Sequence, residues 1–152
     1  MKISIRAASS LLPLLVSGAA VAGPVLEEVV VTAQLRQQSL QDVPVSVSAI
    51  GGEKMMEAGI AKIEDLQAYV PNFTMSESGI GTDIYIRGIG SGENQGFEQS
   101  VGMYVDGIYY GRAQLARAPF LDLSRVEVLR GPQNILLGKN SIAGAINIKT
   151  AD

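Results

Sequence analysis

A stretch near the C-terminus, residues 126–148, limits the possible folds more than any other part of the chain. Apolar and polar residues alternate at both of its ends, in Val126–Val128 and Ile146–Ile148, which predicts two strands that each bury one face. Between them, Pro132 suits the first turn of a helix, and Gly138 is placed to stop that helix. The stretch predicts a strand, a turn, one short helix, a glycine-rich loop and a second strand.

The first 22 residues have the pattern of a secretory signal peptide. Lys2 and Arg6 form a positive start, and a short apolar stretch follows them. Residues 20–22 are a small-x-small cleavage site, so we expect cleavage before Gly23. A transmembrane helix is the disfavoured alternative, because the apolar run is short and contains a proline and a glycine. Removing 22 of the 152 residues from this exported chain leaves 130, enough for one domain.

The composition excludes most classes of enzyme and of metal site. The chain contains no cysteine and no histidine, so a disulfide framework, a thiolate metal site and Ser-His-Asp or Cys-His catalysis are ruled out. Loss of Lys2 and Arg6 with the signal peptide takes the formal net charge from −3 to −5, which argues against a nucleic-acid partner. The acidic residues are too scattered for a carboxylate metal site, and no phosphate-binding motif is present. We expect no catalytic residue, metal or cofactor.

The remaining sequence predicts a small α+β domain. The clearest local signal is Asp106-Gly107, which lies between apolar and aromatic runs and predicts a β-hairpin. Residue spacing predicts further strands at 43–50, 73–75, 84–87 and 121–130, and helices at 53–58 and 62–69. The predicted fold class is therefore α+β, with a small mixed β-sheet and short helices, in a domain that spans residues 42–152.

The order of these motifs resembles the plug domain of TonB-dependent outer-membrane receptors. The residues that carry the resemblance are Val126–Gln133, Leu137–Asn140, Ala143–Ile148, Val43–Val47, Pro71–Phe73, Ile86–Gly88 and Val105–Gly107. Asn134 and Lys139 are mild departures, since the family commonly has glycine and arginine there. The resemblance runs from about residue 27 to the C-terminus.

The chain is too short to contain the barrel that encloses such a plug. A plugged barrel has ~22 strands of ~9–11 residues, about 200 residues in strands alone. We therefore expect a plug without its barrel, either truncated or acting with a barrel supplied elsewhere.

Residues 23–41, here called the lead segment, precede the predicted domain. Their centre is a β-branched run that favours an extended conformation but has no neighbouring hairpin signal. One alternative is an ordinary first strand of the domain; the other is a mobile strand that waits for a partner edge. The run also resembles the TonB box of the family. The resemblance implies that TonB pairs with Glu27, Glu28, Val29, Val30, Val31, Thr32 and Ala33.

Three charged residues stand in or beside apolar strands, where an unpaired charge is costly. They are Arg87, Glu127 and Arg130. Salt bridges within the domain are one alternative for all three. The resemblance implies the other, since family arginines at these two Arg-Gly motifs face acidic residues on the barrel wall. We therefore assign the three residues to barrel contact.

A polar, glycine-rich loop at residues 91–99 is the candidate ligand-facing segment. A flexible connector is the simpler alternative. In the functional interpretation the loop is apical and meets the substrate above the plug through Asn94, Gln95, Phe97 and Gln99. A weaker second candidate patch consists of Tyr109, Tyr110 and Arg112.

The resemblance implies the gating plug of a receptor that takes up a siderophore–iron complex or a similar nutrient. Its partners are then TonB, a β-barrel domain and the small-molecule ligand. The chain is expected in the outer membrane when it lies within a barrel, and otherwise in the periplasm. The alternative function is a free periplasmic plug-like module that binds a ligand or regulates a partner.

Overall fold

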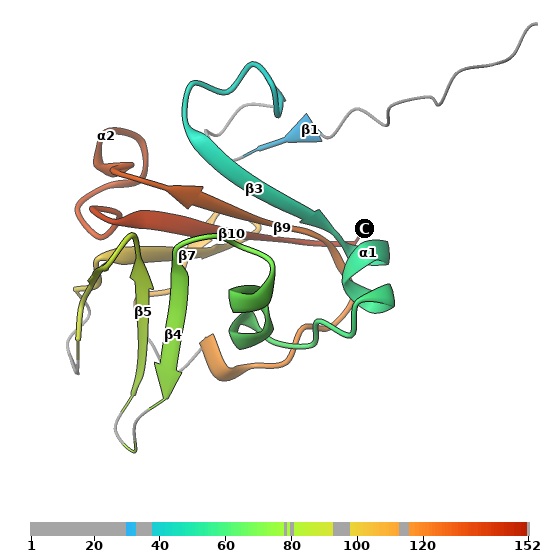
Figure 1. Ribbon diagram of the computed structural model, residues 1–152. Coiled ribbons are helices and arrows are strands. Elements are labelled where there is room, and N and C mark those ends of the chain that lie inside the picture. Colours follow the sequence, from blue (N-terminus) through green and yellow to red (C-terminus); the bar gives the residue numbers. More distant parts are fainter. Residues whose placement is uncertain are drawn as a thin grey trace, which may run out of the picture.

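The computed structural model describes residues 30–32, 38–77, 79, 81–92, 98–112 and 116–151. Its largest sheet has five strands in the order β3-β9-β10-β7-β8 (Figure 1). These strands are β3 (Ser46–Gly51), β9 (Leu123–Arg130), β10 (Gly144–Thr150), β7 (Val101–Val105) and β8 (Ile108–Tyr109). β10 runs parallel to β7 and antiparallel to β9, so the sheet is mixed.

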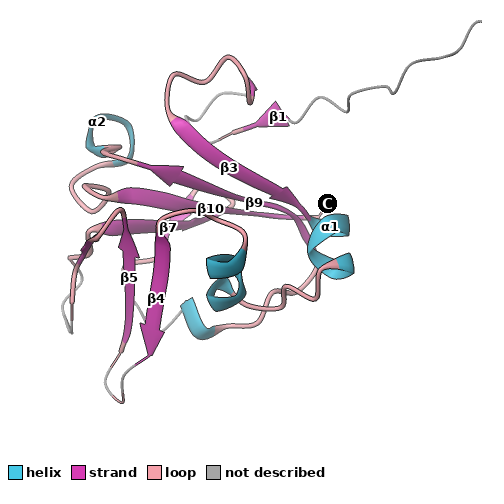
Figure 2. Ribbon diagram, viewed as in Figure 1, coloured by secondary structure: helices cyan, strands magenta, loops and turns pink. Residues whose placement is uncertain are grey.

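Two smaller sheets and short helices accompany this sheet. One sheet consists of β4 (Phe73–Glu77), β5 (Thr82–Ile86) and β6 (Ile89–Gly90), and the other of β1 (Val30–Val31) and β2 (Gln38–Ser39). The helices are α1 (Gly52–Glu57), the 3₁₀ helix η1 (Ile63–Ala68) and α2 (Asn134–Leu137) (Figure 2). This arrangement confirms the predicted α+β class with a mixed sheet. None of the described helices is long and apolar enough to cross a membrane.

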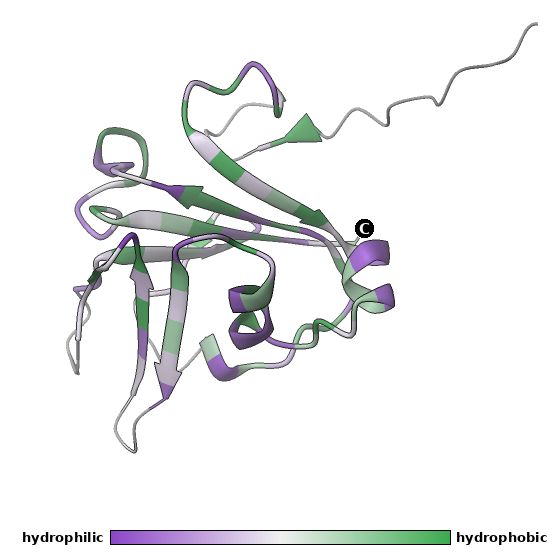
Figure 3. Cartoon of the chain, viewed as in Figure 1, coloured by the Kyte–Doolittle hydropathy of each residue, from purple (hydrophilic) through white to green (hydrophobic). Residues whose placement is uncertain are grey.

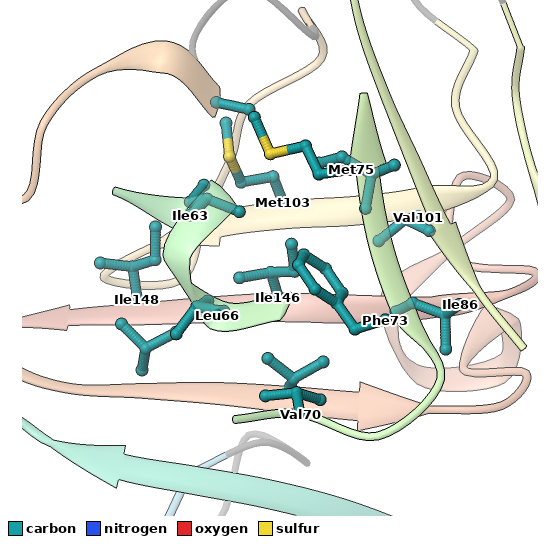
Figure 4. Packing of buried hydrophobic residues seen from close by; sticks show 14 of the residues in the cluster. Ile63, Leu66, Val70, Phe73, Met75, Ile86, Val101, Met103, Ile146 and Ile148 are labelled. Atoms are coloured by element: carbon teal, nitrogen blue, oxygen red, sulfur yellow. The ribbon is translucent and has the colours of Figure 1, made fainter. Parts of the chain in front are cut away.

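The main hydrophobic core lies between the five-stranded sheet, the three-stranded sheet and η1. Leu66 and Phe73 pack from η1 and β4 toward Ile146 on β10 (Figure 4). Leu66, Ile86 and Ile146 each have none of their surface exposed. Figure 3 shows hydrophobic residues along β3, β9 and β10. The core therefore joins elements from most of the described chain.

Several local predictions needed correction at element boundaries. The segment predicted as a helix at 62–69 is a 3₁₀ helix, and the Asp65 carboxylate accepts hydrogen bonds from the backbone N–H groups of Ala61 and Lys62 at its start. Pro132 lies outside α2, which begins at Asn134. Gly138 ends α2 with a φ of 86°, as its position indicated.

Strand β9 is buried on both faces, which contradicts the prediction of one buried face. All of Val126–Leu129 are buried. Val126 and Val128 belong to the main core, whereas Leu129 packs with Tyr104 and Ala145 in a second cluster. A central strand that is covered on both sides has no solvent-facing side. The alternating pattern in the sequence therefore predicted an exposed face that does not exist in the structure.

The predicted hairpin joins β7 to β8 at Asp106-Gly107. Both residues have positive φ values, 49° and 81°, as a tight hairpin turn of this kind requires. The Asp106 carboxylate also accepts hydrogen bonds from Lys149 Nζ at 2.8 Å and from Thr150 Oγ1 at 2.7 Å. These bonds, from Lys149 first and then Thr150, lower the pKa of Asp106 from 3.8 to about 2. The turn is thereby tied to the end of β10.

We predict that Gly144→Ala destabilises the domain by roughly 2–4 kcal/mol. A Cβ atom at Gly144 would overlap the carbonyl oxygen of Leu129, because β9 and β10 are tightly paired there. The matched control is Gly51→Ala, since nothing lies within 4 Å of a Cβ at that position. Urea denaturation measures both variants, and equal losses of stability would show that Gly144 sets no close approach.

We predict that Asp106→Asn removes part of the acid sensitivity of the domain. The folded-state pKa of Asp106 is depressed, so its stabilisation is present above the unfolded value of 3.8 and is lost as the pH falls toward about 2. Asparagine tolerates the positive φ of this turn and keeps the hairpin. Urea midpoints measured between these pH values should fall less steeply in the variant, and an unchanged slope would contradict the prediction.

Candidate functional site

The described part of the lead segment is docked against the domain. Val30 and Val31 pair with Ser39 and Gln38, respectively, and Val31 has 1% of its surface exposed. The expectation that this run has no neighbouring strand to pair with is therefore wrong for Val30–Val31, because β2 follows closely in the chain. The mobility of the segment stays a prediction. Glu27, Glu28, Val29 and Ala33 lie outside the described residues.

A buried polar cluster holds Thr32 onto the five-stranded sheet. Glu127 on β9 is fully buried, with none of its surface exposed. It accepts hydrogen bonds from the Thr32 backbone N–H at 2.8 Å, from Arg125 Nε at 2.6 Å and from Asn147 Nδ2 at 2.9 Å. The Thr32 hydroxyl group accepts a further bond from Arg125 Nη2 at 3.0 Å. Residues far apart in the sequence thus satisfy one buried charge.

The assignment of Glu127 to barrel contact is wrong in this structure. Its carboxylate oxygens already have partners within the domain, and the docked lead segment covers it. An ionised carboxylate that is removed from water needs such a set of donors. The sequence indicated the cost of this charge, but the residues that compensate it, Arg125 and Asn147, carried no signal of their own.

Arg87 and Arg130, in contrast, have no acidic partner among the described residues. Arg87 follows β5, is exposed and has a φ of 54°, a conformation that few bulky residues adopt. Its Nη1 atom lies 3.5 Å from the position of a Cβ on Gly131, beside Arg130. The Nε atom of Arg130 is buried without a hydrogen-bond partner in the described structure, and its Nη1 donates to the Pro71 carbonyl at 3.4 Å. The Arg87 side chain thus reaches the turn that follows β9, directly after Arg130 in the chain.

The candidate ligand loop is only partly described. Asn94, Gln95 and Phe97 lie outside the described residues. The Gln99 side chain donates from Nε2 to the Gly111 carbonyl at 3.2 Å, so it joins two loops. Glu98 forms an ion pair with Lys139; this contact lowers the pKa of Glu98 and raises that of Lys139.

An open hollow of about 360 Å³ lies beside this ion pair. Its lining is mostly polar: Gly90, Ser91, Glu98, Gln99, Ser100, Lys139, Asn140 and Ile142. Among the weaker candidates, Tyr109 packs against Tyr104 with ring centroids 5.5 Å apart, as a packing residue at a sheet end does. No group of three or more metal-binding side chains occurs in the part of the chain that the structure describes.

The comparison with known families decides the class of this domain. The model of the TonB-dependent Receptor Plug Domain matches residues 39–145. The chain belongs to the TonB-dependent receptor plug family. The resemblance found in the sequence motifs is thereby confirmed.

Relatives of this plug domain are much longer proteins. An iron-regulated outer membrane virulence protein of Vibrio cholerae is 36% identical over 132 residues, which is 82% of this chain and 20% of the relative. The pesticin receptor of Yersinia enterocolitica is 32% identical over 108 residues, which is 70% of this chain and 16% of the relative. The chain thus spans at most about a fifth of the length of these two relatives.

Solved structures agree with the plug assignment. The ferric yersiniabactin uptake receptor FyuA of Yersinia pestis has a TM-score of 0.64 and 31% identity, over 71% of this chain and 17% of the receptor. The ferripyoverdine receptor of Pseudomonas aeruginosa, in its ferripyoverdine-bound structure, has the same TM-score at 20% identity, over 81% of this chain and 16% of the receptor. The second likeness supports the fold alone.

We predict that Arg87→Met combined with Arg130→Met changes the free energy of unfolding of the isolated plug by less than about 1 kcal/mol. The reason is that neither guanidinium has an acidic partner in the described residues. Arg117→Met is the matched control, because Arg117 donates to Thr82 Oγ1 and to the Gly81 carbonyl. That control should lose about 1–3 kcal/mol in urea titrations. A larger loss in the double variant than in the control would identify internal bridges.

Proposed function

We propose that this plug gates a TonB-dependent outer-membrane receptor that takes up a siderophore–iron complex or a similar nutrient. The family supports the gating role, and the named ligands of several relatives support the ligand class. Among those relatives are a ferric yersiniabactin uptake receptor and a hemin receptor. A vitamin B12 transporter of Vibrio vulnificus is also similar, at 31% identity, so the proposal extends to a similar nutrient.

The observation that carries the barrel part of this proposal is the pair of arginines. Neither Arg87 nor Arg130 has an acidic partner among the described residues, and a positive charge is stabilised where counter-charges neutralise it. The positive φ of Arg87 carries a backbone cost for a bulky residue, and the Arg87 N–H donates to the Asn72 carbonyl at 2.8 Å. We infer that carboxylates on the inner wall of a barrel supply the missing partners, since guanidinium groups bind carboxylates in a bidentate geometry. Glu127 takes no part in this contact.

The lead segment is the proposed TonB-binding element. Val30 is 41% exposed, and among the described strands β1 pairs with β2 alone. An extended run with a free edge suits strand addition, in which backbone hydrogen bonds supply affinity. We propose that TonB pairs with residues 27–33 and pulls on them. The plug itself performs no bond chemistry in this proposal.

The ligand is proposed to bind near the polar hollow and to contact the candidate loop at residues 91–99. The described wall of the hollow offers hydroxyl, amide and charged groups through Ser91, Gln99, Lys139 and Asn140. Loops carried on a rigid sheet are common binding elements. Asn94, Gln95 and Phe97 remain proposed ligand contacts. We place the assembled receptor in the outer membrane.

We predict that Val30→Pro abolishes binding of the plug to purified TonB while its core remains folded. Proline removes a backbone N–H donor from the added strand, and Val30, which is 41% exposed, belongs to neither core cluster. Val30→Thr is the control, since it keeps both the donor and the β-branched shape. Calorimetric titration with TonB measures the loss of binding, and circular dichroism shows whether the core remains folded. Equal TonB binding by both variants would exclude strand addition at Val30.

Whether the plug works inside a barrel can be tested by fractionating cells that carry the complete gene. A barrel-enclosed plug is recovered with outer membranes. Recovery of all of the plug in the soluble periplasm would instead support a free binding or regulatory module.

A further inference from the structure

The contact between Thr32 and β9 consists mostly of polar interactions. Among the described lead residues before β2, only Val31 is buried, and Val30 is 41% exposed. The apolar area that docks this end of the segment is therefore small. The polar contacts are dense by comparison: Thr32 offers its N–H to Glu127 Oε1, and its hydroxyl group lies 3.0 Å from Arg125 Nη2 and 3.4 Å from Asn147 Nδ2. At this end of the segment, one carboxylate and its donors thus supply the polar docking contacts beside one buried valine.

Such an attachment is easily reversed, in contrast to an apolar one. When a strand leaves an apolar cleft, the exposed apolar surface makes the open state costly. When Thr32 leaves Glu127, the carboxylate and the Arg125 guanidinium regain water, which offsets much of what the contacts contributed. Arg125 is already 21% exposed, so it lies at the edge of the cluster that water reaches first. β9 itself is paired with β3 and β10, so departure of Thr32 breaks none of the backbone pairing of the five-stranded sheet.

We propose that Glu127 is a positioning residue that holds the lead segment in a docked state and sets how often it is released. Arg125 and Asn147 orient the carboxylate, and Thr32 is the residue that it holds. The docked and the released segment are two states of the same folded plug. The link between release and TonB rests on the proposed function; the hold of Glu127 on Thr32 does not.

The experiment measures release separately from unfolding. The chain has no cysteine, so a single introduced thiol reports one position. Val31→Cys, at a site with 1% exposure, reacts with a maleimide only when the lead segment is released. Val70→Cys, at a core site with 2% exposure, reacts only on unfolding. Each reporter is made in the full chain, alone and together with the changes described next.

Glu127→Ala should raise the modification rate at Val31→Cys by roughly tenfold or more relative to any change at Val70→Cys, because it removes hydrogen bonds to a charged group. Glu127→Gln keeps an acceptor for the Thr32 N–H and should restore much of the protection. Thr32→Val removes only the hydroxyl group and should give a smaller increase. Its effect should be non-additive with that of Glu127→Ala, since both changes break one network.

Thr82→Val is the matched control. It removes a hydrogen bond to Arg117 at the three-stranded sheet, so it should leave the Val31→Cys rate unchanged. The proposal is overturned if Glu127→Ala and Thr32→Val leave the Val31→Cys rate unchanged. Equal increases at Val31→Cys and Val70→Cys would overturn it as well, because Glu127 would then act on global stability only. Thr32→Val keeps the test decisive if Glu127→Ala fails to fold.

A second measurement distinguishes failure of this inference from failure of the proposed function. If only the released segment pairs with TonB, Glu127→Ala should tighten binding of purified TonB in proportion to the rise in released population. Faster modification at Val31→Cys with unchanged TonB affinity would contradict the TonB proposal and leave the role of Glu127 standing. An unchanged modification rate would contradict the role of Glu127, whatever the TonB affinity.

Discussion

The pairing of β9 with β10 at the centre of the five-stranded sheet is the contact on which the rest of the domain depends. β9 also pairs with β3, and β10 also pairs with β7, so the two strands hold both halves of the sheet together. Both faces of β9 must then be covered. The main core covers one face, while the second cluster and Thr32 cover the other. The lead segment is thus part of the cover of the sheet as well as the proposed binding element.

The opposite surroundings of Glu127 and Arg130 follow from strand geometry. Successive side chains of a strand point to opposite faces, and these residues are an odd number of positions apart. Glu127 therefore lies on the face that the lead segment covers, and Arg130 lies on the other face with Val126 and Val128. The alternation of side chains along a strand already predicts that Glu127 and Arg130 face opposite sides of the sheet. The assignment of both residues to barrel contact did not take this into account. Arg130 and Arg87 retain that assignment as a proposal.

The parts of the fold that the sequence predicted are those that depend on near neighbours in the chain. The Asp106-Gly107 turn and the end of α2 at Gly138 are set by backbone conformations that few residues adopt. The docking of Thr32 on Glu127 joins residues that are 95 positions apart, and no local pattern encodes it. The parallel pairing of β7 with β10 is equally non-local. The barrel-contact assignment of Arg87 and Arg130 came only from the family resemblance. No local pattern relates these two residues, because one follows β5 in the three-stranded sheet and the other ends β9 in the five-stranded sheet.

The position of β10 also determines when the domain can be completed. β3, β7 and β9 all precede β10 in the chain, yet β10 lies between β7 and β9. Until Thr150 has been synthesised, β7 lacks the strand that connects it to β9, whereas the three-stranded sheet can form from neighbouring residues. Topologies dominated by such distant pairings fold slowly. Closure of the core is thus expected to be a late step in folding, because it waits for β10 to pair with both β7 and β9.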